Sequence, residues 1–247
     1  MARQERKEPV MTNVSLCEKS RLFLNYLDEW YQNLPRLPLA DVVGSDPERV
    51  AVFSVDMING FCKEGPLAGP RVGALIEPVV AVFRQAYDLG VRALVLTQDT
   101  HDPNTPEFQA YPPHCLAGTP ESQTIAELQA LPFAGEVTVI PKNSLSSDIG
   151  TSLGAWLGER PHLTTFIVVG DCTDLCVYSL AMHLRLSANA HNLQGRRVIV
   201  PAAAVDTFDI PVNVAREAGI LAHHGDLHHL IFLHHMALNG IEVVAAL

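Results

Sequence analysis

Short apolar runs alternate with longer amphipathic segments along most of this chain, and this alternation is the feature that most limits its fold. The clearest run is Val50-Ala51-Val52-Phe53-Ser54-Val55, which is apolar at almost every position. A continuous run of this kind is typical of a parallel strand that is covered on both faces. Further predicted strands occupy residues 91–97, 137–140, 165–169, 198–200 and 241–244. Predicted helices occupy residues 71–89, 121–130, 175–193, 211–218 and 226–239. The sequence therefore predicts an α/β fold with a doubly wound, mostly parallel six-stranded sheet and helices on both faces.

The residues before this pattern form a region of a different kind. Residues 22–34 have the spacing of an amphipathic helix, and Pro35, Pro38 and Pro47 interrupt the segment that follows. We therefore predict an N-terminal helical extension and linker at residues 1–49, packed on a main domain at residues 50–247.

Composition narrows the classes of function. The chain has 247 residues and a net charge of −10, which argues against nucleic acid or an anionic membrane as a partner. No apolar run reaches the roughly 18 residues that span a bilayer, and the polar N-terminus does not resemble a signal peptide. The five cysteines show neither disulfide nor zinc-finger spacing, which favours reduced thiols. We therefore expect a cytoplasmic protein.

Cys176 has the placement of a nucleophile. It opens the predicted helix that follows the strand ending in Val168-Val169-Gly170. A helix N-terminus offers partial positive charge and free N–H groups, so this position predicts a lowered thiol pKa and a reactive thiolate. The alternative is a buried structural cysteine, because cysteine is among the most buried residue types.

Polar residues follow the other strands as well. Asp56 follows the first strand directly, and Lys142 follows the third. Ligands of open α/β sheets bind at the carboxyl ends of strands, so a carboxylate, an amine and the thiol of Cys176 are expected in one crevice. Each has a simpler alternative: Asp56 as a helix cap and Lys142 as a solvated side chain.

The end of the second strand carries a pattern that suits a metal. Asp99 and His101 are two residues apart, so both can face one way from an extended segment. Glu107 and His114 follow, and Pro112 and Pro113 stiffen the loop before His114. Two imidazoles with one or two carboxylates suit Zn²⁺, Fe²⁺ or Mn²⁺. The alternative is a loop rich in His and Asp that binds no metal.

At these residues the chain resembles the isochorismatase-like cysteine hydrolases, and within them the plant-type nicotinamidases. The likeness rests on Asn59-Gly60-Phe61-Cys62, on Tyr111-Pro112-Pro113-His114-Cys115 and on the Gly170–Cys176 segment. The segment Val205-Asp206-Thr207-Phe208-Asp209-Ile210-Pro211 adds to it. The resemblance extends from about residue 50 to the C-terminus of the sequence.

The resemblance implies a reaction and a role for each site residue. The reaction is hydrolysis of nicotinamide to nicotinate and ammonia through a thioester, as a step of NAD salvage. The catalytic residues would be Asp56, Lys142 and Cys176, and the backbone amides of Cys172 and Cys176 would form the oxyanion hole around a cis peptide bond.

Further roles follow from the same resemblance. Phe61 and Tyr111 would enclose the substrate ring. One divalent metal, zinc in the first place, would bind Asp99, His101, Glu107 and His114. A homo-oligomer is also expected.

Several departures and alternatives stay open. Ile58 stands where many relatives have Gln, and Asp171-Cys172 stands where many have Val-Ala. Isochorismatases and ureido or carbamoyl amidohydrolases typically lack the metal motif, and a non-catalytic metal-binding relative is a further alternative. The pairs His223/His224, His228/His229 and His234/His235 suggest a second metal site, but neighbouring residues point different ways on a helix. We therefore assign these histidines to packing, surface or interface.

Overall fold

The computed structural model describes residues 15–247, which form two compact units. The first unit ends at Asn33 and the second runs from Leu34 to Leu247. In the first unit, helix α1 spans Leu16–Gln32 and begins with a capping box in which Ser15 and Glu18 satisfy each other's backbone N–H groups. The predicted helix at residues 22–34 is thus confirmed and longer, while its packing on the main domain stays a prediction.

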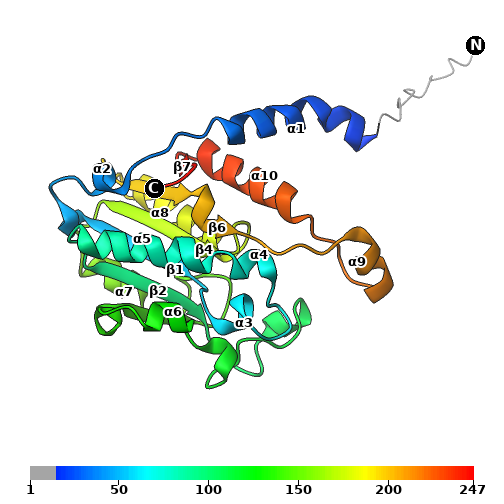
Figure 1. Cartoon of the computed structure of the whole chain (residues 1–247), viewed down its shortest axis with the longest axis horizontal. Helices are drawn as coiled ribbons and strands as arrows, with labels where there is room; N and C mark the ends of the chain where they lie inside the picture. Colours follow the sequence, from blue (N-terminus) through cyan, green and yellow to red (C-terminus); the bar gives the residue numbers. More distant parts are fainter. Residues whose placement is uncertain (1–14) are drawn as a thin grey trace, which may run out of the picture. The chain divides into compact units, whose positions relative to one another are not determined.

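The second unit is built on one parallel sheet (Figure 1). Its strands are β1 (Val50–Val55), β2 (Ala93–Asp99), β3 (Thr138–Lys142), β4 (Thr165–Asp171), β5 (Arg197–Pro201), β6 (Val205–Asp206) and β7 (Glu242–Val244). The order is β3-β2-β1-β4-β5-β7, and the two-residue β6 pairs with the end of β4. The predicted doubly wound sheet is confirmed, with β6 as a seventh strand that is too short to show in the sequence pattern.

Helices cover both faces of this sheet. They are α2 (Leu39–Val43), α3 (Asn59–Cys62), α4 (Pro70–Gly73), α5 (Ile76–Asp88), α6 (Ala126–Gln129), α7 (Leu153–Gly158), α8 (Cys176–Ala190), α9 (Val212–Ala218) and α10 (Gly225–Leu238). Figure 1 shows α5 running across one face of the sheet. Helix α8 contacts β4 and β5, and α10 packs beside α8 and β7. None of the helices among the described residues is long and apolar enough to cross a membrane.

The continuous apolar character of β1 has a direct structural cause. All six of its residues are buried, and alternate side chains enter the two layers on either side. Val50 and Val52 join the core beneath α2 and α5. Phe53 points the other way, with its ring 5.8 Å from that of Trp156 in α7. A strand covered on both faces cannot show a polar alternation, and this one does not.

Two predicted helices and one boundary differ from the expectation. The predicted helix at 71–89 is divided into α4 and α5, and the one at 121–130 is divided into a 3₁₀ turn at Pro120–Ser122 and α6. Residues 34–49 belong to the second compact unit, where Leu39 is fully buried. The start of the hydrolase domain at residue 50 stays a prediction.

Candidate active site

The carboxyl edge of the sheet brings Asp56 into a sharp turn. Asp56 follows β1 with φ of +55°, a left-handed conformation that Asp adopts more readily than most residues. Its backbone N–H donates to Thr97 O at 2.9 Å. Its side-chain Oδ1 accepts from the Asp99 N–H at 2.8 Å. The turn thus fixes a fully buried carboxylate beside the end of β2.

Lys142 is the last residue of β3 and is also buried. Its Nζ lies 2.8 Å from Asp56 Oδ2 and 3.5 Å from Cys176 Sγ. It also donates to Asp99 Oδ1, and to Ser144 O at 3.2 Å. A buried ammonium is stable only when paired, and two carboxylates here supply that pairing.

Cys176 is the first residue of α8, as the sequence predicted. The approach of β4 to β1 requires Gly170, because its φ is +107° and a Cβ there would overlap the backbone of Val55. One carboxylate oxygen from each of Asp56 and Asp99 and the Sγ of Cys176 lie within 4.8 Å of one another. The structure therefore brings Asp56, Lys142 and Cys176 into one buried cluster.

The expected lowering of the Cys176 pKa is wrong for this buried site. Burial raises the pKa of the Cys176 thiol well above its ordinary value, against the opposing effect of Lys142. Desolvation disfavours the charged thiolate more than the helix N-terminus and the ammonium favour it. The resting residue is a thiol, so a base must accept its proton during attack.

Asp56 has the ionisation that such a base needs. Burial and the nearby Asp99 carboxylate raise the pKa of Asp56 to about 6, against the opposing effect of Lys142. Burial disfavours the ammonium of Lys142, but Asp56 and Asp99 outweigh it and raise the pKa of Lys142. At neutral pH the cluster therefore holds an ionised Asp56 and a cationic Lys142 beside the thiol.

A second cluster consists of Asp99, His101, Glu107 and His114. Each offers one ligand atom, and these atoms lie within 4.8 Å of one another. His101 Nε2 lies 3.4 Å from Asp99 Oδ2 and 3.8 Å from Glu107 Oε1. His114 Nε2 lies 3.9 Å from the same Asp99 oxygen. The four residues that the sequence grouped are thus brought together.

The chemistry of this cluster fits a divalent cation. His101 is fully buried, and among the described residues neither of its ring nitrogens nor Glu107 Oε1 has a hydrogen-bond partner. His114 Nδ1 lies 2.8 Å from Pro112 O, which fixes the proton on Nδ1 and turns Nε2 toward the cluster. Metal-binding histidines commonly donate their other N–H in this way. The second cluster can therefore hold a divalent metal.

Asp99 belongs to both clusters, which sequence reasoning did not anticipate. One of its oxygens accepts from Lys142, and the other faces His101 and His114. Burial opposes its ionisation, but the charge of Lys142 and the nearby imidazoles of His101 and His114 lower the pKa of Asp99. Its place in the sequence shows only that it ends a strand, whereas the link to Lys142 depends on the Asp99–Lys142 register of β2 and β3.

Aromatic rings surround His114 in the second cluster. The rings of Phe61 and Tyr111 lie edge-on to His114, with centroids 5.6 Å and 6.2 Å away. Phe108 lies 5.6 Å from His114 and 5.4 Å from His101, a contact that the sequence analysis missed although Phe108 follows Glu107 directly. Phe61 and Tyr111 therefore lie beside the second cluster, and their contact with a substrate ring stays a prediction.

The backbone amides proposed for the oxyanion hole lie on the turn between β4 and α8. The Asp171–Cys172 peptide is cis, as the resemblance implied. The turn is closed by Leu175 N and Val177 N, which donate to Cys172 O at 3.0 Å and 3.2 Å. Within the described part of the chain, the N–H groups of Cys172 and Cys176 donate no hydrogen bond. Both are free to bind a substrate oxygen.

The histidines near the C-terminus form no second metal site among the described residues, because no group of three potential ligands includes them. His229 and His234 are buried, and Tyr178 OH lies 3.2 Å from His235 Nδ1. The prediction of packing or surface roles agrees with these positions for His234 and His235. His223 and His229 contact Asp174 and Thr173, in the turn between β4 and α8.

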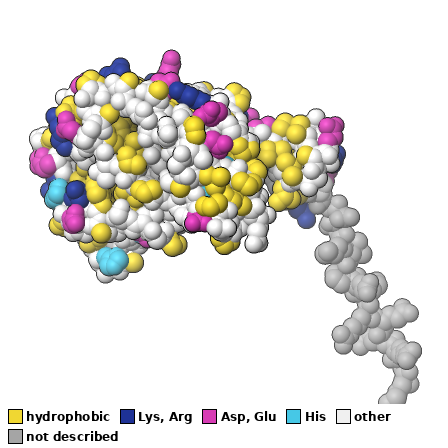
Figure 2. All heavy atoms as spheres, turned by 90° about the horizontal axis from the view of Figure 1, so that it is seen from below, with side chains coloured by type: hydrophobic (Ala, Val, Ile, Leu, Met, Phe, Trp, Pro, Cys, Tyr) yellow, Lys and Arg dark blue, Asp and Glu magenta, His cyan; other side chains and the backbone are white. Residues whose placement is uncertain are grey.

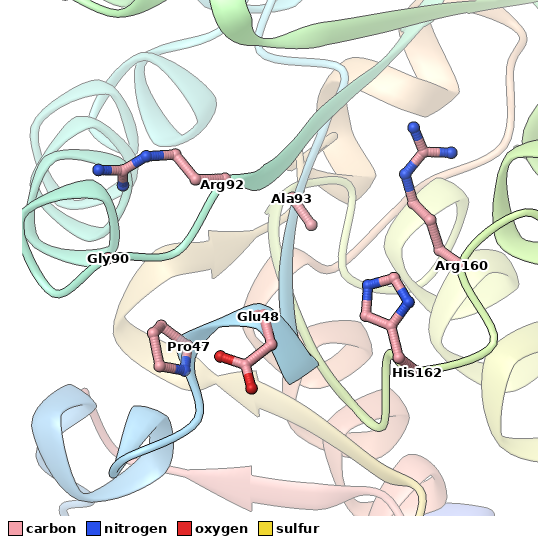
Figure 3. Close-up of a pocket in the computed structure, with 7 residues that line it drawn as sticks. All are labelled: Pro47, Glu48, Gly90, Arg92, Ala93, Arg160 and His162. Carbon is pink, nitrogen blue, oxygen red and sulfur yellow. The ribbon is translucent and has the colours of Figure 1, made fainter.

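A surface cavity of about 320 Å³ lies elsewhere (Figure 3). It is lined by Ala93, the first residue of β2, and so opens at the amino ends of the strands. Figure 3 shows the guanidinium groups of Arg92 and Arg160 pointing away from the space between Glu48 and His162. Since ligands of this fold bind at the opposite edge, this cavity is not the candidate active site.

A doubly wound parallel sheet with an acid, an amine and a thiol clustered at its carboxyl edge defines the class of cysteine-dependent α/β hydrolases. The chain belongs to the isochorismatase family, whose isochorismatase domain matches residues 50–216.

Individual relatives narrow the comparison. Nicotinamidase 1 of Arabidopsis thaliana is 31% identical over 212 residues, which cover 79% of this chain and 85% of that protein. The nicotinamidase/pyrazinamidase of Mycobacterium tuberculosis is 33% identical over 180 residues, covering 68% of this chain and 92% of that protein. The crystal structure of pyrazinamidase/nicotinamidase from Streptococcus mutans superimposes with a TM-score of 0.61 at 26% identity, covering 79% of this chain and 99% of that chain.

Proposed function

We propose that this protein is a nicotinamidase, which hydrolyses nicotinamide to nicotinate and ammonia. The observation that carries the proposal is the pair of adjoining clusters, one of Asp56, Lys142 and Cys176 and one of four potential metal ligands, joined through Asp99. The names of the relatives from Arabidopsis thaliana and Mycobacterium tuberculosis support the same substrate. The product places the enzyme in NAD salvage.

Asp56 acts as the base for the nucleophile. Its carboxylate takes the thiol proton of Cys176, and Lys142 at 3.5 Å stabilises the thiolate that forms. The sulfur attacks the amide carbon, and the C=O electron pair moves to oxygen. Protonated Asp56 then gives its proton to the departing nitrogen, which leaves as ammonia. Water hydrolyses the thioester, with Asp56 again as the base, and restores the thiol.

The amides of Cys172 and Cys176 stabilise the oxyanion in both halves of the reaction. Their N–H groups have no other acceptor in the described residues, so they are available when negative charge develops. A donor of this kind contributes about 3 kcal/mol to the transition state. Since the two amides lie at the start of the turn between β4 and α8 and at the first residue of α8, the turn fixes their relative positions.

Asp99, His101, Glu107 and His114 would hold the metal, and zinc suits two imidazoles with two carboxylates better than the harder Mn²⁺. When bound, the cation supplies a Lewis-acid partner for the pyridine nitrogen and so orients the ring. Phe61 and Tyr111 would bind the faces of that ring. The nucleophile cluster therefore acts on the carboxamide, while the ligand cluster selects substrates with a ring nitrogen.

The main alternative is another amidohydrolase of this family, acting on a ureido or carbamoyl substrate. Such an enzyme needs the nucleophile cluster but has no use for a ligand cluster beside it. A non-catalytic metal-binding relative would have no use for the buried Asp56, Lys142 and Cys176. The presence of both clusters favours the nicotinamidase over either alternative.

Three amides test the proposal. We expect ammonia release from nicotinamide and from pyrazinamide by the zinc-loaded enzyme, and a much lower kcat/KM for benzamide, which has the carboxamide but no ring nitrogen. A site built around a polar partner rejects an analogue without it by about 10⁴-fold. Equal kcat/KM for benzamide and nicotinamide would contradict the role of the ligand cluster. Turnover of an N-carbamoyl amino acid in place of nicotinamide would support the alternative.

Two further parts of the proposal are the location of the enzyme in the cell and its oligomeric state. A cytoplasmic location fits an enzyme of NAD salvage. A homo-oligomer fits the exposed apolar side chains on and after α9, which are Val212, Val214, Ile220 and Leu221. Figure 2 shows one face of the chain, on which apolar side chains gather in patches between charged ones.

A further inference from the structure

The turn that leads into Cys176 is contacted by a segment that is distant in the sequence. The turn comprises residues 172–175, between β4 and α8. The segment comprises residues 223–229, where the chain enters α10. This segment lies beyond the residues 50–216 that match the family, and both parts belong to the second compact unit.

His229 contacts the first of two neighbouring residues in the turn. Its Nδ1 lies 2.8 Å from Thr173 Oγ1, and both side chains are buried. Thr173 is held on its other side, because its N–H donates to Asp206 O in β6 at 2.9 Å. Burial lowers the pKa of His229, so the ring is neutral and bonds to the hydroxyl as a neutral partner.

His223 contacts the second residue, Asp174. Its Nε2 lies 2.7 Å from Asp174 Oδ2, and Asp174 is only 7% exposed. Its Nδ1 lies 2.9 Å from Phe208 O, and the two rings stack at 3.9 Å. A buried carboxylate is costly without a partner, so His223 keeps the side chain of Asp174 in place.

Helix α10 is anchored independently of these two histidines. Arg71 bonds to Asp226 at the start of α10 and to Asp206 in β6, at 2.6 Å and 2.7 Å. Arg71 also donates to Thr207 O at 2.9 Å. Replacing His223 or His229 therefore removes its contact with the turn, while the bonds of Arg71 still hold α10 against β6.

The contacts of the two histidines fall between the two proposed oxyanion donors. Thr173 and Asp174 lie between Cys172 and Cys176, whose amides are the proposed donors to the oxyanion. A movement of Thr173 or Asp174 shifts both amides, because hydrogen bonds to Cys172 O close the turn. A displacement of about 1 Å in a reacting geometry costs about 100-fold in rate.

We propose that His223 and His229 are positioning residues, which hold the Thr173–Asp174 pair so that the Cys172 and Cys176 amides meet the transition state. The proposal deepens the proposed function and rests on it for the reaction.

Replacing each histidine by Asn in one variant and by Gln in another distinguishes the positioning role from a general packing role. An Asn side chain places its amide near the Nδ1 position of His, and a Gln side chain places it near Nε2. His229→Asn and His223→Gln therefore keep the contacts to Thr173 and Asp174, while His229→Gln and His223→Asn lose them. His235→Asn is the matched control, because His235 lies on α10 with His229 and contacts Tyr178 instead of the turn.

We expect His229→Gln and His223→Asn to lose about 10- to 100-fold in kcat for nicotinamide with KM changed by less than about threefold. The kcat of His229→Asn, His223→Gln and His235→Asn should stay within about threefold of the kcat of the unchanged protein. Amide hydrogen exchange of residues 172–177 becomes faster only in the two losing variants. Equal loss in both variants at a position, or a loss in kcat without faster exchange in 172–177, would overturn the proposal.

Ammonia release and amide hydrogen exchange also distinguish failure of the proposed function from failure of the positioning role. If the unchanged protein releases no ammonia from nicotinamide, the proposed function fails. The exchange of residues 172–177 still decides whether the histidines hold the turn, since it requires no substrate. Unchanged exchange of residues 172–177 in all four variants would refute the claim that the two histidines hold the turn.

Discussion

Asp171 is a buried carboxyl group that the proposed reaction does not use, and replacing it should make the protein more stable. It is 1% exposed, and within the described residues its Oδ2 has no hydrogen-bond partner. Its Oδ1 accepts only a weak bond from the Cys172 thiol at 3.6 Å. Burial, and then the charge of Asp56, raise the pKa of Asp171 well above its ordinary value.

The size of the effect of Asp171→Val follows from this environment. An unpartnered buried polar group costs about 1–3 kcal/mol, and Val is nearly the same size and apolar. We therefore expect a gain of about 2 kcal/mol at pH 7, or about 4–8 °C in Tm for a domain of this length.

The pH dependence gives the sharper test. The folded protein binds the Asp171 proton more tightly than the unfolded chain, so the wild-type protein loses stability as pH rises above about 4, until the raised folded-state pKa is passed. The advantage of Asp171→Val should thus grow between pH 4.5 and 7.5 in urea unfolding followed by circular dichroism. Asp171→Asn is the matched control, because it removes the titration and keeps the polar group. An advantage that does not change with pH, or a less stable Val variant, would refute the reasoning.

Three further predictions concern the two clusters. Cys176→Ala should leave less than about 1% of the activity with the fold and metal content intact, whereas Cys62→Ser should retain most of it; residual turnover above about 1% in the Ala variant would contradict the assignment of Cys176 as the nucleophile. His114→Ala should lose bound zinc by elemental analysis together with activity, and Glu107→Gln should lose less of both, because water can replace one ligand of an open site; full zinc in the His114 variant would show that it is no ligand. The kcat/KM should fall about tenfold per pH unit below about pH 6 as the raised pKa of Asp56 is passed and the base is protonated; a profile that stays flat to pH 5 at constant zinc content would exclude this assignment.

Much of the fold could be predicted because its signals are local. The apolar run Val50–Val55 is β1 with the same limits, and Cys176 is the first residue of α8 as expected. The four predicted metal ligands lie together in the structure, because a single strand end and its loop supply all four. Breaks within helices were not predicted, since α4 and α5 are divided by a turn at Ala74 and Leu75 that carries neither proline nor glycine.

The rest depends on residues that meet only in three dimensions. The pKa of Cys176 was predicted in the wrong direction because a helix N-terminus is visible in sequence and full burial is not. The contacts of His223 and His229 with the catalytic turn join residues separated by 49 and 56 positions. The paired spacing of the histidines along the chain suggested nothing about which partner each would contact.

The double role of Asp99 sets a limit for anyone who would redesign this protein as a metal-free amidase. His101, Glu107 and His114 belong to the second cluster alone, so exchanging them for apolar residues removes no direct partner of Lys142 or Cys176 among the described residues. Asp99 cannot be treated in the same way, because it is also the counter-charge of Lys142. Its removal would leave a buried ammonium with Asp56 as its single anionic partner, at a cost of about 3–5 kcal/mol for breaking a buried pair. A metal-free descendant of this scaffold must therefore keep Asp99, one of the proposed metal ligands, as the partner of Lys142.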